Sequence, residues 1–111
     1  MNNKKQPIAL FNGVVVTTNG LYSVEDIDVE TAKVYVKENG FISAVGHEAT
    51  AEILSEILES SIPMNRIQFQ QEVGQIAIIF KLNIRPDEGV ILNKEEIHKV
   101  GFSLKKMLRI E

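Results

Sequence analysis

The 111 residues of this chain suffice for one compact domain, and 44% hydrophobic with 24% charged residues is typical of globular proteins. The net charge is −3, from 12 Lys and Arg against 15 Asp and Glu. This charge argues against a protein that coats duplex DNA or RNA, because such proteins neutralise many phosphates with clustered cations. The lack of cysteine excludes disulfides, thiol catalysis and cysteine-based zinc sites.

The longest apolar stretch, Ile76 to Phe80, has only the length of a strand, and residues 1–5 lead into Pro7 without an apolar segment. We therefore expect no membrane span and no signal peptide, and a cytoplasmic location. The two histidines, His47 and His98, are far apart and lack the spacing of a zinc-protease motif. A metal site would need carboxylates gathered from several places, and we expect none.

The first predicted elements are two strands. Residues 8–18 are rich in β-branched side chains, with an interruption at Asn12-Gly13 that is typical of a turn or bulge. Asn19-Gly20 indicates a second turn, and residues 21–27 fit a short, half-buried strand. The pattern predicts that the two strands form a hairpin.

Two helices flank a brief apolar strand over residues 41–45. Asp28 is a suitable N-cap for a helix from Val29 to about Glu38, and Gly40 follows its end. The second helix, from Glu48 to about Glu59, has an apolar stripe on one face and glutamates on the other.

The last third of the chain predicts a β-hairpin, a short helix and a closing strand. Residues 66–71 alternate and residues 76–84 run back as an apolar strand. Asn93 and Glu96 have the spacing of a capping box for a helix to about Lys99, and a strand follows Gly101. Residues 1–111 should therefore form one α+β domain, a mixed sheet of about five strands flanked by helices.

The first candidate site is the start of the second helix. The strand over residues 41–45 passes through Gly46 into a helix N-terminus, whose unpaired N–H groups and partial positive charge suit a phosphate. His47 stands there, and an imidazole can hold or release a proton near neutral pH. It could protonate a leaving oxygen. The alternative is that His47 or Thr50 only caps the helix.

The second candidate is the segment Arg85-Pro-Asp-Glu88-Gly89, directly after the apolar strand. Pro86 and Gly89 favour a tight turn, which can aim Arg85 and Glu88 at one spot. Arg85 could stabilise charge on a phosphate, and Glu88 could orient a hydroxyl or the arginine. The alternative is an exposed turn with a weak ion pair.

Three further residues are predicted to lie at the rim of the sheet. Asn12 interrupts the first strand, and Asn65 and Arg66 begin the fourth. A turn alone can account for Asn12, and Arg66 can be a solvated edge residue. The glutamates at 52, 56 and 59 are most simply a solvated helix face, and His98 receives no role.

Three segments in this order resemble the viral ring-nuclease family, anti-CRISPR proteins of archaeal viruses and bacterial mobile elements such as prophages. The segments are Gly40-Phe-Ile-Ser-Ala-Val-Gly-His-Glu-Ala-Thr50, Pro63-Met-Asn-Arg-Ile67 and Ile84-Arg-Pro-Asp-Glu-Gly89-Val-Ile-Leu. The resemblance spans nearly the whole chain. It implies a homodimer that binds cyclic tetra-adenylate, the messenger of type III CRISPR defence, and destroys it in the host cytoplasm.

The implied reaction needs no metal or other cofactor. A ribose 2'-hydroxyl attacks the adjacent phosphorus in line, which gives a 2',3'-cyclic phosphate and a free 5'-hydroxyl. The resemblance assigns the general acid to His47, the phosphate ligand to Arg85 and the acidic partner of the 2'-hydroxyl or the arginine to Glu88. Substrate-binding positions match as well: Asn12, Gly46, Thr50, Asn65 and Arg66.

The chain departs from the family pattern at two places. Val15 stands where the archaeal viral proteins commonly have a serine, so a ligand contact is lost or moved. Glu48-Ala49 replaces a commoner Asp-Ser pair at the helix entry.

Two other classes of function remain open at this stage. One is a non-catalytic protein that sequesters a cyclic nucleotide with the same residues. The other is a regulatory or interaction protein of a mobile element that binds protein or DNA, although the net charge fits duplex DNA poorly.

Overall fold

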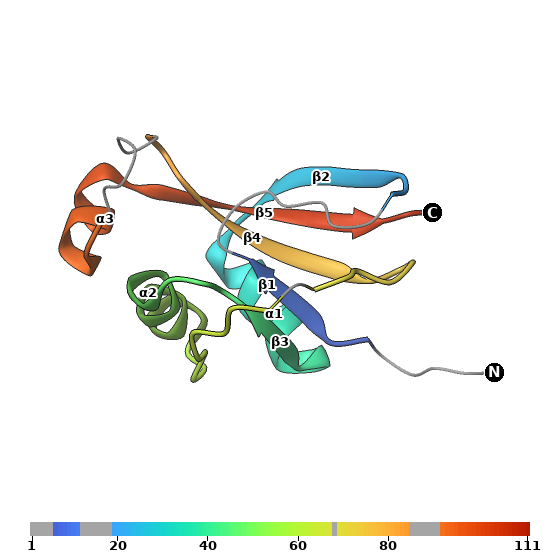
Figure 1. Cartoon of the computed structure of the whole chain (residues 1–111), viewed down its shortest axis with the longest axis horizontal. Coiled ribbons are helices and arrows are strands. Elements are labelled where there is room, and N and C mark those ends of the chain that lie inside the picture. The colour runs from blue at the N-terminus through green and yellow to red at the C-terminus, as the bar shows by residue number, and fades with distance from the viewer. Residues whose placement is uncertain (1–5, 12–18, 68, 85–91) are drawn as a thin grey trace.

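The computed structural model describes residues 6–11, 19–67, 69–84 and 92–111. Five strands form one mixed sheet, and three helices of the described residues pack against it (Figure 1). The predicted α+β class is therefore confirmed. The elements in chain order are β1 (Ile8–Phe11), β2 (Tyr22–Ile27), α1 (Val29–Asn39), β3 (Phe41–Ala44), α2 (Glu48–Leu58), β4 (Ile76–Leu82), α3 (Lys94–Val100) and β5 (Phe102–Arg109).

The strands lie in the order β2-β5-β4-β1-β3. β1 is parallel to both neighbours, and its Leu10 is in register with Ser43 of β3 and Ile78 of β4. β5 is antiparallel to β4 and to β2. The carboxyl ends of the three parallel strands β1, β3 and β4 therefore meet at one edge of the sheet, where ligands commonly bind in α/β arrangements.

The predicted hairpin is wrong for β1, because β2 lies at the far edge of the sheet and pairs with β5. Two carboxylates of β2 face lysines of β5. Asp26 lies opposite Lys105, with 2.6 Å between oxygen and ammonium nitrogen, and Glu25 lies opposite Lys106 at 3.0 Å. Such cross-strand pairs favour this register. Residues 12–18 of the predicted first strand lie outside the described residues.

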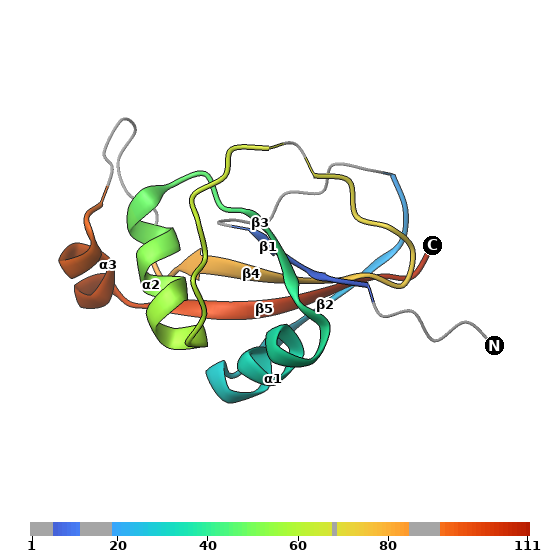
Figure 2. The ribbon, with the colours of Figure 1, turned by 90° about the horizontal axis from the view of Figure 1, so that it is seen from below.

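The sheet has an apolar cluster on each face. On one face, Leu10 and Ile78 pack with the inner sides of α1 and α2, including Ile53 and Leu54, all 0–1% exposed. The opposite face is covered by the chain that follows α2, and there Phe69 lies against Phe11 with ring centroids 5.9 Å apart (Figure 2). Helices thus cover one face, and an irregular segment covers the other.

The second predicted hairpin is also wrong, because the described residues of 66–71 do not form a strand. Both edges of β4 are already occupied, by β1 and β5, so no further strand can pair with it. Two side chains of this segment, Arg66 and Gln71, bond to backbone elsewhere in the fold. Gln71 is 2% exposed, and its amide nitrogen donates to the carbonyls of Gln75 and Met107 at 2.6 and 2.9 Å.

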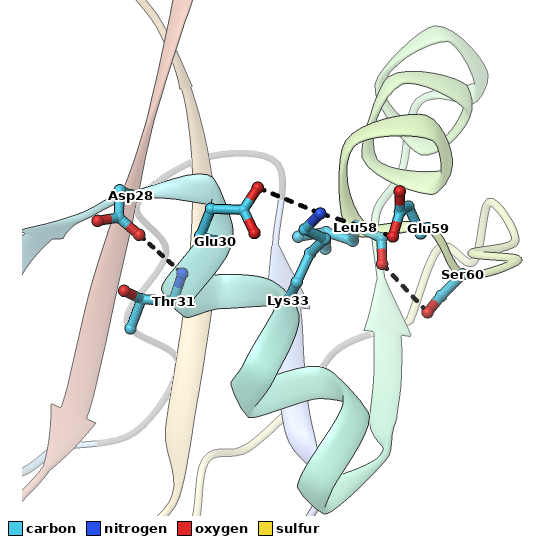
Figure 3. A network of polar contacts seen from close by, with 7 residues as sticks. All are labelled: Asp28, Glu30, Thr31, Lys33, Leu58, Glu59 and Ser60. Carbon is cyan, nitrogen blue, oxygen red and sulfur yellow. Dashed lines mark hydrogen bonds and ion pairs between the residues drawn. The ribbon is translucent and has the colours of Figure 1, made fainter.

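The predicted ends of α1 and α2 are close to the observed ones. Asp28 caps α1 by accepting a hydrogen bond of 2.7 Å from the Thr31 N–H (Figure 3). Gly40 ends the helix at φ 72°. α2 ends one residue early, because Glu59 is left-handed at φ 53°. Lys33 of α1 contacts Glu59 at 3.5 Å and Glu30 at 3.2 Å, so it ties α1 to the end of α2.

The cap of α1 should make stability depend on pH. The hydrogen bonds from Thr31 lower the pKa of Asp28 below its ordinary value of 3.8. The contribution of Asp28 to the free energy of unfolding is therefore complete above pH 3.8. It is lost as the pH falls through the lower pKa that Asp28 has in the folded protein. The amide side chain of the variant Asp28→Asn still accepts the bond but does not titrate. For Asp28→Asn we expect the free energy of unfolding, measured by urea unfolding, to fall less steeply than for the wild type between about pH 5 and pH 2. Equal slopes in the two proteins would contradict this account.

The capping box of α3 is confirmed. The Asn93 side chain accepts from the Glu96 N–H at 2.9 Å, and the Glu96 carboxylate accepts from the Asn93 N–H at 3.2 Å. Lys94, the first residue of α3, forms an ion pair with Glu56 of α2. The start of α3 therefore lies beside the last turn of α2.

Candidate functional site

His47 lies where the sequence predicted it, at the N-cap of α2. β3 ends at Ala44, and three residues, 45–47, connect it to α2. The His47 backbone is extended, at φ −130° and ψ 131°, and its side chain is exposed and makes no capping hydrogen bond. The capping role weighed above is therefore not filled by the imidazole, which leaves it available to a ligand.

The other residues predicted to lie at the start of α2 differ in their surroundings. Thr50 lies in the first turn of α2 and is only 6% exposed, so its side chain belongs to the interior. The Gly46 carbonyl accepts a hydrogen bond of 3.0 Å from Nε of Arg66. Arg66 is itself exposed, so this bond fixes one nitrogen of its guanidinium beside His47.

Asn65 also lies beside the connection from β3 to α2, and its hydrogen bonds go to backbone carbonyls. Its N–H donates to the Val45 carbonyl at 2.7 Å, and its amide nitrogen donates to the Ser43 carbonyl at 2.9 Å. The structure thus brings Asn65 and Arg66 to Gly46 and His47, although they are almost twenty residues apart in sequence. Asn12, Arg85 and Glu88 lie outside the described residues.

A hollow of about 800 Å³ opens in front of His47, between the starts of α2 and α3. His47, Arg66 and Lys94 line it, together with the carboxylates of three glutamates: Glu48, Glu52 and Glu95. Carboxylates repel a polyanion, so binding of a phosphate here would depend on the cationic groups of Arg66 and Lys94 and on His47.

Several lining residues were not singled out from the sequence. Met64 comes from the segment after α2, and Leu92, Asn93 and Lys94 come from the start of α3. The capping box located the start of α3, but nothing in the sequence indicated that this start lies beside α2. Met64 belongs to the segment 63–67 that carries the resemblance, and its side chain is exposed.

Among the described residues, no group of three or more histidines and carboxylates is arranged to hold a metal ion. Within the same residues, no helix has both the length and the apolar character needed to cross a bilayer.

The sequence profile of one family matches residues 8–104, which include every element described above except the end of β5. The chain belongs to the STIV B116-like family. Its relatives include proteins of viruses and of a bacterium. Uncharacterized protein 26 of a Sulfolobus islandicus filamentous virus is 41% identical over 81 residues, which cover 72% of this chain and 69% of that protein.

A bacterial relative covers still more of this B116-like chain. Uncharacterized protein YddF of Bacillus subtilis is 32% identical over 106 residues, or 94% of this chain and 98% of that protein. The B116 protein of Sulfolobus turreted icosahedral virus has the same fold, with a TM-score of 0.67 over 93% of this chain and 99% of that one, at 18% identity. The resemblance to viral proteins is confirmed, and the activity it implies stays a prediction.

Proposed function

We propose that this B116-like protein is a metal-independent ring nuclease that opens cyclic tetra-adenylate. One observation supports the proposal above all. His47 stands exposed at the N-cap of α2 without capping the helix, and it shares a hollow with Arg66. A helix N-terminus and a guanidinium attract a phosphate, and the imidazole beside them can supply a proton.

The substrate carries its own nucleophile, so the protein has to align three atoms and protonate one of them. The ribose O2' forms a bond to phosphorus while the bond from phosphorus to O5' breaks. His47 gives its proton to O5', and the proton of the 2'-hydroxyl passes to solvent. The products are a 2',3'-cyclic phosphate and a free 5'-hydroxyl. Alignment and acid catalysis each contribute large rate factors, so no metal is required.

Arg85 and Glu88 enter the proposal through the resemblance alone. Arg85 would stabilise the negative charge on the phosphate in the transition state, and Glu88 would orient the 2'-hydroxyl or the arginine. A second copy of the chain completes the site in the proposal, since a two-fold dimer sets one His47 against each of two opposite phosphates of a four-nucleotide ring. Removing the messenger would silence type III CRISPR defence.

The test is a cleavage assay with purified protein, cyclic tetra-adenylate and excess chelator. We expect linear products ending in 2',3'-cyclic phosphate and, as the reaction proceeds, two dinucleotides from each ring. Mass spectrometry separates these products from the ring and from 3'-phosphates. Loss of activity in chelator would contradict the metal-independent mechanism.

A second candidate is sequestration of the ring without cleavage. Val15 motivates it, because the resemblance implies a ligand contact from a serine at this position, and valine has no hydroxyl. Tight binding with an intact ring after hours at micromolar protein would support sequestration over catalysis.

A further inference from the structure

The free edge of β3 is covered by a short segment, residues 63–66, which we call the strap. β3 is the last strand of the sheet, so among the described residues one of its edges has no neighbouring strand. Asn65 of the strap takes the place of a strand there. Its N–H donates to the Val45 carbonyl at 2.7 Å, and its Nδ2 donates to the Ser43 carbonyl at 2.9 Å.

Two further hydrogen bonds fasten the strap at its ends. Ser43 is 5% exposed, and its Oγ donates to the Pro63 carbonyl at 2.6 Å. Nε of Arg66 donates to the Gly46 carbonyl at 3.0 Å. Four hydrogen bonds therefore hold the backbone from residue 43 to residue 46, and the last of them lies one residue before His47.

The imidazole of His47 has no hydrogen bond to any described residue that would fix its orientation. Many catalytic histidines are oriented by a carboxylate or carbonyl on the second ring nitrogen. Here the position of the imidazole depends on the backbone of His47. That backbone follows directly from the part of the chain that the strap holds.

We propose that Ser43 and Asn65 are positioning residues, which place His47 by fixing the path of residues 43–46 through the strap. The inference rests on the proposed function, in which His47 is the general acid. It gives Asn65 a role other than the ligand contact implied by the resemblance, because its backbone N–H and its Nδ2 both donate to backbone carbonyls of the protein.

The energetic consequence should fall on turnover. A general acid acts within hydrogen-bonding distance of its target, and a misplacement of about 1 Å can cost about 100-fold in rate. Asn65→Ala and Ser43→Ala should lower kcat by about 10 to 100-fold with KM within about twofold of wild type. A direct ligand contact would show the opposite pattern, a raised KM.

Asn65→Leu is the sharper variant, because it keeps most of the side-chain volume and the backbone N–H bond, adds no charge near the phosphate, and cannot donate to the Ser43 carbonyl. Asn39→Ala is the matched control. Its Nδ2 also donates to a backbone carbonyl at 2.9 Å, that of Tyr35, at the end of α1. It removes the same kind of bond away from His47, and kcat should stay at the wild-type value.

Amide hydrogen exchange of residues 45–49, followed by NMR, tests the strap without reference to catalysis. We expect faster exchange in the Asn65 and Ser43 variants and unchanged exchange in Asn39→Ala. Unchanged exchange in the Asn65 variants, unchanged kcat, or a raised KM with unchanged kcat would each overturn the inference. A wild-type protein that cuts no ring refutes the proposed function instead, and the exchange rates then still decide whether the strap fixes this backbone.

Discussion

Replacing His47 by alanine should leave binding of cyclic tetra-adenylate close to wild type and slow its cleavage by about 10² to 10⁴-fold, the usual share of a general acid. The fold should tolerate the change. The His47 side chain is exposed and makes no capping bond, so its removal breaks no interaction that holds α2 in place. Single-turnover kinetics with protein in excess measure the chemical step separately from product release.

His98→Ala is the control for this variant. His98 is the other histidine of the chain, and it is exposed on α3, where its ring meets Phe102 edge-on with centroids 6.2 Å apart. Its loss should leave the cleavage rate unchanged. Full activity in His47→Ala would rule out the general acid proposed here, whereas loss of both binding and cleavage would make His47 a ligand contact.

A ring of 2'-deoxy sugars should bind and remain intact. The reaction depends on a nucleophile that belongs to the substrate, and deoxygenation removes it without changing the charge of the phosphates. Over a time in which the all-ribose ring is consumed, we expect no product within the detection limit of mass spectrometry. Competition against the all-ribose ring then measures whether binding is retained.

Cleavage of the deoxy ring would show that water is the attacking group. The products would then end in a phosphate without the cyclic ester, and a base to activate the water would be needed. Failure of the deoxy ring to bind would mean instead that the site recognises the 2'-hydroxyls. The test of the cleavage mechanism would then be the rate at which His47→Ala cleaves the all-ribose ring.

Local signals located the helices. Asp28 with Gly40, and Asn93 with Glu96, fix helix ends through contacts within one or two turns, so the sequence displays them directly. The strand pairs depend on distant partners. The partner of β2 is β5, near the other end of the chain, and turn signals such as Asn19-Gly20 do not reveal such a pairing.

The features of the site also divide into those that local sequence predicts and those that depend on distant contacts. Gly46 and the amphipathic stripe of α2 are adjacent in sequence, and they sufficed to place His47 at a helix start. The bonds of Asn65 and Arg66 to the end of β3 depend on the path of the chain after α2, which no local pattern describes. The substrate is a further step, because the same backbone geometry can hold many phosphates.

The sheet topology has a consequence for synthesis on the ribosome. β1, the first strand made, is completed on one side by β3 and on the other only by β4, and β2 finds its partner in β5, the last strand. The sheet cannot close until nearly the whole chain has left the exit tunnel, and non-local pairing of this kind slows folding. A truncation before β5 should therefore remain unfolded rather than form a smaller domain.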